Sequence, residues 1–428
     1  MATSLSTYDG LNYFRMRQSD GQMTPGERDY DLFSPAFKRD PFSTWARMRG
    51  HDPIYPHRAP DGSTIWYVTR YADAIAVLRD DVNYCKDPCN AFNAEALPRR
   101  KSAVHQLINE NMLFADPPEH TRLRALVNQA FTPRRIEQLR PRVLAIADRL
   151  LDGIAGEGAA DLIVNYALPL PVAIISELLG IPEADRVEVA SWSQAIVSPG
   201  SRNLNYSTRK QRVRAFIDYL QGLFADRQTN PQDDLVTALV QAEEAGQRLN
   251  EAELSSMVAL LLVTGHETTV NLIGNGVLAL LLHPEQRWRL EAQPDLWPAA
   301  VEELLRYDGP VETSTTRWAR RDHELQGHQI RRGDVVRMVL SSTNRDADRF
   351  TAPDELRVDR EENRHLAFGL GIHYCLGAPL ARLEGHVALQ RLFERLPELE
   401  LGVPPAQLRW RSGVLFRGLV GLPVRWIV

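Results

Sequence analysis

Residues 368–382 read Phe368-Gly-Leu-Gly-Ile-His-Tyr-Cys375-Leu-Gly-Ala-Pro-Leu-Ala-Arg382, a glycine-rich loop with one cysteine, followed by a run rich in leucine and alanine. Glycine lets the backbone take a positive φ or approach a flat ligand closely. A loop that ends where a helix begins directs backbone N–H groups at the cysteine sulfur, and such donors stabilise a thiolate. Most single cysteines are small buried hydrophobic residues, so the loop by itself leaves both that interpretation and a metal-binding thiolate open for Cys375.

Length and composition describe an ordinary globular protein. The chain has 428 residues, of which 44% are hydrophobic and 25% charged. Because no long linker or internal repeat divides it, we expect a flexible N-terminal extension over residues 1–30 and one domain over residues 31–428. The net charge of −5 argues against nucleic-acid binding.

The chain shows no targeting or membrane signal. The N-terminus lacks the basic and apolar regions of a signal peptide. The longest apolar run, residues 257–263, is too short to span a membrane. We expect a cytoplasmic protein that does not associate with membranes, with a monomer as the default state.

The three cysteines are too few for a disulfide framework and suit a reducing compartment. Cys85 and Cys89 lie four positions apart, so a metal or redox pair remains an alternative. No second Cys/His pair lies near enough in sequence to complete a zinc site.

Helical patterns dominate the chain after about residue 120. Asn250, with Glu253 three residues later, predicts the N-cap of a helix that runs to about residue 282 and crosses the core. Further helices are expected over residues 134–154, 171–179, 213–224 and 298–307, with one beginning at residue 284. Strands are expected over residues 53–56, 63–69, 323–325, 335–339, 413–416 and 422–426. The fold class is therefore mainly α with small β-sheets.

The long helix contains a polar turn, Thr264-Gly-His-Glu-Thr-Thr269. An acid beside an alcohol is costly to bury without partners. Gly265 and hydroxyls that bond to backbone carbonyls both weaken a helix, so we expect a local kink and a groove for a small molecule or water.

These segments together resemble the cytochrome P-450 superfamily, in its soluble bacterial type, from about residue 40 to the end. The similarity rests on Phe-x-x-Gly-x-x-x-Cys-x-Gly, the polar turn, Asp116-Pro-Pro-Glu-His-Thr-Arg-Leu-Arg124 and Glu303-Leu-Leu-Arg306, in that family's order. The resemblance implies the cytochrome P-450 fold, a triangular prism of helices. In that fold haem b lies between the long central helix and the helix after the cysteine loop.

Roles for individual residues follow from the resemblance. Cys375 would be the axial thiolate ligand of the iron. Thr268 would hydrogen-bond dioxygen, and Glu267 would connect it to a proton-delivering water chain. Thr264 stands where a smaller residue is usual and would narrow the site. The remaining cofactor-binding residues implied are His120, Arg124, Arg317 and His373 at the haem propionates, with Gly265 and Phe368 against the haem.

The implied activity is that of a haem-thiolate monooxygenase. It would insert one oxygen atom of dioxygen into a lipophilic small molecule, such as a fatty acid, terpenoid, steroid or polyketide, by hydroxylation or epoxidation. The chain carries no dinucleotide fingerprint, so electrons would come from a separate ferredoxin or flavodoxin with its reductase. A basic docking patch is predicted from Arg122, Arg134, Arg135, Arg382 and Arg391.

Several points stay open at this level. The Glu303–Arg306 pair resembles a structural anchor whose third partner is Arg357 or Arg360. A peroxide-driven oxygenase or an oxidative-coupling catalyst on the same fold is an alternative, although the intact Glu267–Thr268 pair argues against it. A haem-binding sensor or carrier is a further alternative. We expect the substrate pocket to be lined from residues 84–114, 192–206, 311–316 and 414–416.

Overall fold

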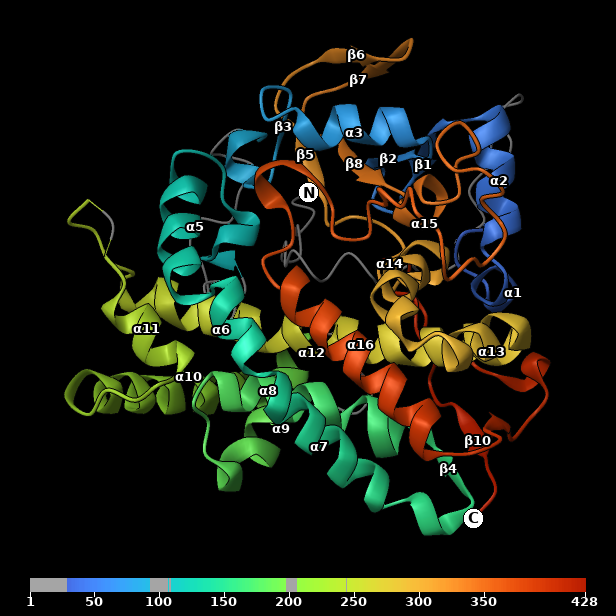
Figure 1. Ribbon diagram of the computed structural model, residues 1–428. Coiled ribbons are helices and arrows are strands. Elements are labelled where there is room, and N and C mark those ends of the chain that lie inside the picture. Colours follow the sequence, from blue (N-terminus) through green and yellow to red (C-terminus); the bar gives the residue numbers. More distant parts are fainter. Residues whose placement is uncertain (1–28, 93–106, 108, 198–205, 244) are drawn as a thin grey trace.

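The computed structural model describes the chain except for residues 1–28, 93–106, 108, 198–205 and 244 (Figure 1). Nearly all of the expected N-terminal extension, residues 1–30, and parts of two expected pocket stretches, 84–114 and 192–206, lie outside the described residues. The rest is rich in helices, with strands in small sheets. This confirms the predicted class, mainly α with small β-sheets.

The helices form most of the structure. They are α1 Pro35–Arg39, α2 Phe42–His51, α3 Tyr71–Arg79, α5 Glu119–Ala130, α6 Pro133–Gln138, α7 Arg140–Asp152, α8 Pro169–Leu178, α9 Arg186–Val197, α10 Tyr206–Thr229, α11 Leu235–Gln241, α12 Glu251–Leu282, α13 Pro284–Ala292, α14 Trp297–Asp308, α15 Leu340–Thr343 and α16 Ala378–Arg395. The strands are β1 Ile54–Arg58, β2 Thr64–Val68, β3 Tyr84–Cys85, β4 Ala159–Asp161, β5 Arg317–Ala319, β6 His323–Leu325, β7 His328–Ile330, β8 Val335–Met338, β9 Glu400–Leu401 and β10 Pro423–Arg425.

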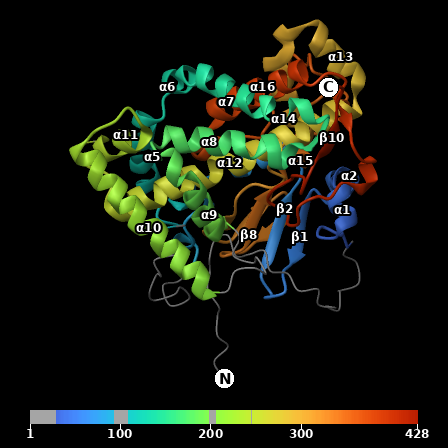
Figure 2. The same cartoon turned by 90° about the horizontal axis from the view of Figure 1, so that it is seen from below.

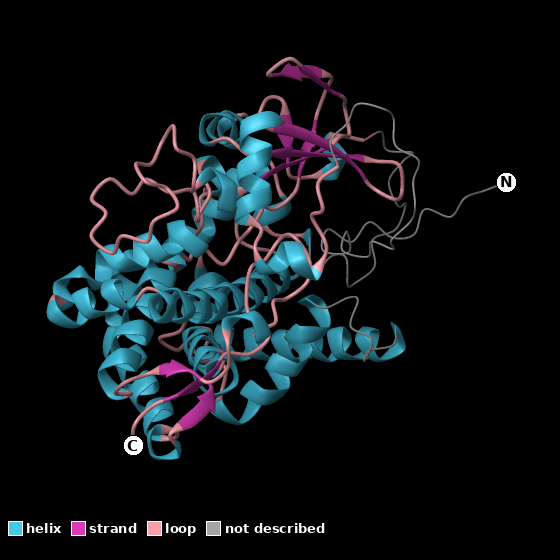
Figure 3. Cartoon of the chain, turned by 90° about the vertical axis from the view of Figure 1, so that its right-hand side faces the viewer, coloured by secondary structure: helices cyan, strands magenta, loops and turns pink. Residues whose placement is uncertain are grey.

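The strands gather at two ends of the molecule with helices between them (Figure 3). One sheet has the order β1-β2-β8-β5-β3, with β2 and β8 parallel and the other neighbours antiparallel. A smaller sheet has the order β4-β10-β9, and β6 and β7 form a hairpin. Because β3 and β8 both pair with β5, segments far apart in sequence meet beside the start of β5.

Helix α12 is the centre of the helical part. Asn250 accepts from the backbone N–H of Glu253, and the Glu253 carboxylate accepts from that of Asn250, which confirms the predicted capping box. The helix is long and apolar enough to span a membrane, but 72% of its most apolar 18-residue segment is buried inside the protein. It is therefore a core helix. Helix α16 crosses it in Figure 1, and β1, β2 and β8 lie to one side of the helices in Figure 2.

Three expected elements differ from the structure. The helix predicted over residues 134–154 is two helices, α6 and α7, separated at Leu139. Pro141 lies in the first turn of α7, where its missing N–H prevents one continuous helix. The strand predicted over residues 413–416 is wrong, because only Phe416 forms a bridge, with Val311. Helix α10 extends well beyond the predicted residues 213–224.

Candidate active site

The cysteine loop joins the sheet end of the molecule to helix α16. Gly369 and Gly371 have φ of 69° and 78°, in the left-handed region that favours glycine. A Cβ on Gly371 would lie 2.7 Å from the carbonyl oxygen of Leu78, so this position also requires the absence of a side chain. The backbone N–H of Cys375 donates to the carbonyl of Phe368 at 3.0 Å, which closes the loop before α16 begins.

The Cys375 sulfur lies at the N-terminus of α16. Burial raises the pKa of its thiol, whereas the backbone N–H groups of Gly377 and Ala378 and the charge of Arg124 lower it. The residue is nevertheless exposed. Donors at a helix start and a nearby guanidinium are the surroundings that stabilise a thiolate. Arg382, which follows on α16, places its guanidinium 4.6 Å from the centre of the Phe368 ring.

The polar turn of α12 keeps its helical hydrogen bonding and adds side-chain bonds to it. The hydroxyl of Thr264 donates to the carbonyl of Leu260 at 2.7 Å, and that of Thr268 to the carbonyl of Thr264 at 3.1 Å. Helix α12 runs without interruption from Glu251 to Leu282, through the turn where a local kink is expected. A Cβ on Gly265 would lie 3.1 Å from the side chain of Ile175, so this glycine allows close packing against α8.

Glu267 is held by a residue that the sequence did not indicate. Its carboxylate forms an ion pair with Arg411, from the segment before β10. The Glu267 side chain is 12% exposed and that of Arg411 41%, so the pair connects the polar turn with the surface. Nothing local in the sequence marks Arg411 for this role.

Four cations predicted from the sequence meet near the cysteine loop. The rings of His120 and His373 lie 4.3 Å apart. Burial lowers the pKa of Arg317 to about 10, and it also lowers the pKa of Arg124. Burial is the largest cause that lowers the pKa of His373, and the charges of Lys86, His120, Arg317 and Arg124 lower it further.

Lys86 is a fifth cation at this place, and the sequence analysis missed it. It follows β3 directly and is 2% exposed. We call His120, Arg124, Arg317, His373 and Lys86 the cation cluster. A lone lysine after a short strand carries no signal in sequence, and only the pairing of β3 with β5 brings it beside Arg317.

The Glu303–Arg306 anchor is completed by Arg360. Arg306 donates to both carboxylate oxygens of Glu303, at 2.7 and 2.8 Å, and Arg360 donates to the same carboxylate at 3.0 Å. Arg357 contributes its backbone N–H, at 2.9 Å. Of the two candidates left open, Arg360 therefore supplies the second side chain.

Glu384 on α16 is a further buried group that the sequence analysis missed. It is fully buried, and burial raises the pKa of its carboxyl group to about 8, against a smaller lowering by the hydroxyl of Thr269. Among the described residues, the Thr269 hydroxyl is the one group that acts on this carboxyl group, and no cation pairs with it. The acid therefore lies in the protein interior without a cation beside it.

The remaining predicted groups have simpler surroundings. The Cys85 thiol is buried and donates to the carbonyl of Trp318 at 3.4 Å, whereas Cys89 is exposed. Neither forms a disulfide, and the described residues contain no cluster of His, Cys, Asp and Glu arranged for a metal ion. Four of the five predicted patch arginines form ion pairs with acids: Arg122 with Glu119 and Glu253, Arg135 with Asp233, Arg382 with Glu302, and Arg391 with Asp148 and Glu394.

The residues present fit haem. The Nε2 atom of His120 is buried with no hydrogen-bond partner among the described residues, and the cation cluster has Asp116 as its acidic neighbour. Two carboxylates on the edge of a flat ligand would satisfy such groups, while the sulfur of Cys375 would hold its iron. A mainly helical fold in which a cysteine loop meets cations and a polar helix turn is the architecture of a haem-thiolate oxidoreductase.

Comparison with known proteins agrees with this class. The cytochrome P450 family model matches residues 191–411. The chain is 46% identical to the polyketide biosynthesis cytochrome P450 PksS of Bacillus subtilis (strain 168), over 91% of this chain and 96% of that protein. It is 43% identical to the cytochrome P450 monooxygenase PikC of Streptomyces venezuelae, over 96% and 97%. The solved structure of PksS from Bacillus subtilis 168 matches with a TM-score of 0.88 and 43% identity, covering 94% of this chain and all of that one.

The chain therefore belongs to the cytochrome P450 family and has the cytochrome P450 fold. It is an oxidoreductase of the P450 monooxygenase type, a family that carries a haem-thiolate cofactor.

Proposed function

We propose that this protein is a cytoplasmic monooxygenase that inserts one oxygen atom of dioxygen into a lipophilic small molecule of secondary metabolism, by hydroxylation or epoxidation. The cofactor is haem b with Cys375 as its axial ligand, and a ferredoxin or flavodoxin with its reductase supplies the electrons. Support for the substrate class comes from relatives named for polyketide biosynthesis and for mycinamicin hydroxylation and epoxidation. The observation that carries the proposal is the Cys375 sulfur at the N-terminus of α16, beside the backbone N–H groups of Gly377 and Ala378.

Each group has a defined task in this reaction. When bound, haem with a thiolate ligand supplies the electron density that cleaves the O–O bond. Cys375 would hold the iron, and the N–H donors at the start of α16 would moderate the charge on sulfur. His120, Arg124, Arg317 and His373 would orient the haem through its carboxylates.

Glu267 and Thr268, both on helix α12, would supply protons to the reaction. Glu267 is paired with Arg411, which is 41% exposed, so its carboxylate lies between the polar turn and the surface. The Thr268 hydroxyl lies one residue further along the same turn; it donates to the carbonyl of Thr264, and its oxygen can accept a hydrogen bond. We expect the two residues to form part of a proton route into the site.

The first test is the carbon monoxide difference spectrum of the reduced protein. We expect a strongly red-shifted Soret band in the wild type and its loss in Cys375→Ser, because a hydroxyl does not replace a thiolate ligand. A variant that kept the band would remove Cys375 from the ligand role.

A second test measures coupling. Thr268→Ala should release more hydrogen peroxide and give less product for each NAD(P)H consumed, while Thr268→Ser should stay close to the wild type because it retains the hydroxyl. Equal coupling in all three proteins would refute the proton role. Full turnover with peroxide alone, independent of Thr268, would favour the peroxide-driven alternative.

A further inference from the structure

Lys86 is a buried cation without a buried acid of its own. Its ammonium group donates to the hydroxyl of Thr315 and, at 3.0 Å, to the carbonyl oxygen of Thr316, which are both neutral acceptors. Burial lowers its pKa far below the usual value, and the charges of Arg317 and Arg337 add to this lowering. Lysine is almost never fully buried unless it is paired with an anion.

Asp116 is the acid whose charge acts on Lys86, but its carboxylate oxygens already accept other hydrogen bonds. Its Oδ1 accepts from the backbone N–H of Lys86 at 2.8 Å. Its Oδ2 accepts from the backbone N–H of Asp87 at 3.1 Å and the amide of Asn90 at 2.7 Å, and lies 3.3 Å from Arg320. Among the described residues no carboxylate forms an ion pair with the Lys86 ammonium group.

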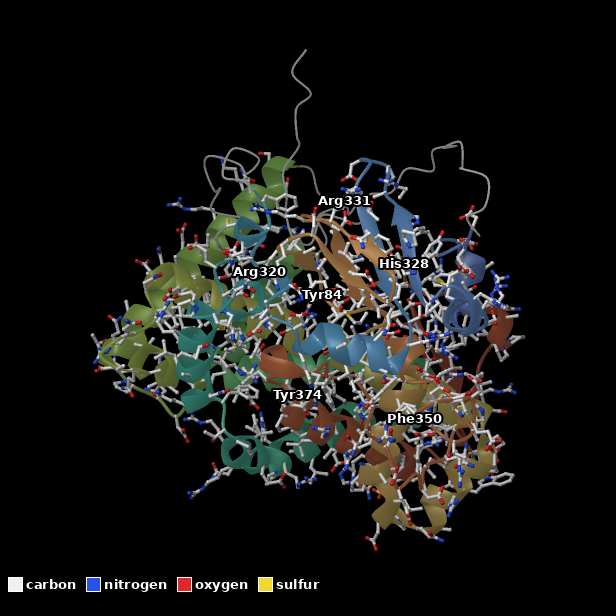
Figure 4. All side chains as sticks on the ribbon, turned by 90° about the horizontal axis from the view of Figure 1, so that it is seen from above. Tyr84, Arg320, His328, Arg331, Phe350 and Tyr374 are labelled. Atoms are coloured by element: carbon white, nitrogen blue, oxygen red, sulfur yellow. The ribbon has the colours of Figure 1, made fainter. Side chains whose placement is uncertain are left out.

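The sheet places Lys86 beside the predicted haem-binding residues. Cys85 pairs with Trp318 in the β3–β5 ladder, so Lys86 follows β3 at the point where Arg317 begins β5. A cavity of about 100 Å³ is lined by Lys86, Arg317, His373 and Asp116 together with the end of α3. Figure 4 shows Tyr84 and Arg320 beside this region.

We propose that Lys86 binds a carboxylate of the haem, as a fifth cation beside the four predicted from the sequence. This rests on the proposed haem site. The ammonium group is a point charge that needs an anion, and the cavity joins it to Arg317 and His373. Because a carboxylate carried by a substrate has the same chemistry, the experiment must separate the two sources.

The test uses the holoprotein of Lys86→Met, which keeps the length of the side chain and removes its charge. We expect haem transfer to apomyoglobin to become about tenfold faster, the effect of losing one hydrogen bond to a charged group. The propionate bending bands of the resonance Raman spectrum should shift as well. Lys86→Arg, which retains the charge, should stay closer to the wild type in both measurements.

Arg320→Gln is the matched control. It removes a cation that also lies beside Asp116 but is not part of the lining of the cavity. It should leave the Raman bands in place and change haem transfer by less than about twofold, as expected for a half-exposed charge. Lys86→Met behaving like this control would overturn the proposal. If only Lys86→Met fails to yield holoprotein, a normal Lys86→Arg supports a need for the charge, and failure of both variants overturns it.

The second arm examines the substrate. A long-chain fatty acid and its methyl ester are titrated against the ferric wild type and Lys86→Met, with the spin-state change as the readout. We expect the preference between acid and ester to be the same in both proteins. A preference lost in Lys86→Met with unchanged Raman bands would assign the carboxylate to the substrate and overturn the haem assignment. Failure of the proposed function would instead appear as absence of the red-shifted carbon monoxide band in the wild type.

Discussion

Two groups of buried charges in this molecule differ in balance. In the Glu303–Arg306–Arg360 network the carboxylate lies between two guanidiniums, and Arg306 also donates to the carbonyls of Asn344, Pro353 and Glu355. In the cation cluster, the charge of Asp116 acts on Lys86, His120 and Arg317, and among the described residues no carboxylate forms an ion pair with the Lys86 ammonium group.

The difference distinguishes buried charges that hold the structure together from buried charges that are available to a ligand. A buried ion pair whose hydrogen bonds are all made holds elements together and leaves no charge for a ligand. An excess of one sign is costly in the folded protein unless an oppositely charged group binds there. The comparison therefore predicts that the network acts on stability and the cation cluster on cofactor retention.

The largest expected effect is on the network. Glu303→Ala leaves Arg306 and Arg360 buried without their carboxylate, and we expect a loss of about 3–5 kcal/mol in the free energy of unfolding. Denaturant unfolding of the holoprotein measures it. Asp218→Ala is the control: Asp218 pairs with Arg214 on the surface and both side chains are more than half exposed, so the loss should be about 0.5 kcal/mol or less. Equal losses would show that the buried network has no special role.

Glu384 is the opposite case, a buried acid that no cation among the described residues neutralises, and it tests whether an unbalanced buried charge is costly. Its pKa is about 8 in the folded protein and near 4.5 when unfolded, so between these values the folded state keeps a proton that the unfolded state has lost. The free energy of unfolding should therefore fall by about 1.4 kcal/mol for each pH unit between about 4.5 and 8. Above that range it should level off.

Glu384→Gln should remove this decline. We expect the variant to gain on the order of 5 kcal/mol over the wild type at pH 9 and less than about 1 kcal/mol at pH 5. Unfolding at the two pH values measures the difference. Glu394→Gln, an exposed position on the same helix, is the control and should show no such gain. A gain in Glu384→Gln that did not depend on pH would contradict the raised pKa.

The smallest expected effect concerns surface charge. Arg391 is paired with Asp148 and Glu394, whereas Arg134 is exposed and forms none of the ion pairs seen among the described residues. Arg134→Gln should slow reduction by a ferredoxin about twofold at low salt, and the difference should vanish at high salt. Arg391→Gln should have less effect. Stopped-flow measurement of the reduction rate over a series of salt concentrations compares the two variants. The same dependence of rate on salt in both would argue against a role for the unpaired Arg134.

Local signals account for what could be predicted. The cap at Asn250, the apolar length of α12 and the glycines before Cys375 each specify conformation through nearby residues. The break between α6 and α7 was missed because apolar spacing continues across Pro141 although the helix does not. The strand expected over residues 413–416 failed because β-forming residues need a partner strand, and only Phe416 has one.

The family, the central helix and the acid and alcohol of its polar turn all follow from the sequence alone, as does the cysteine proposed as the iron ligand. Only the tertiary structure decided that Arg411 holds Glu267, that Arg360 completes the Glu303 network, and that Lys86 joins the cation cluster. The physical reason is the range of the interactions. Caps and turns depend on residues a few positions apart, whereas the balance of buried charge depends on which distant segments the sheets and helices bring together.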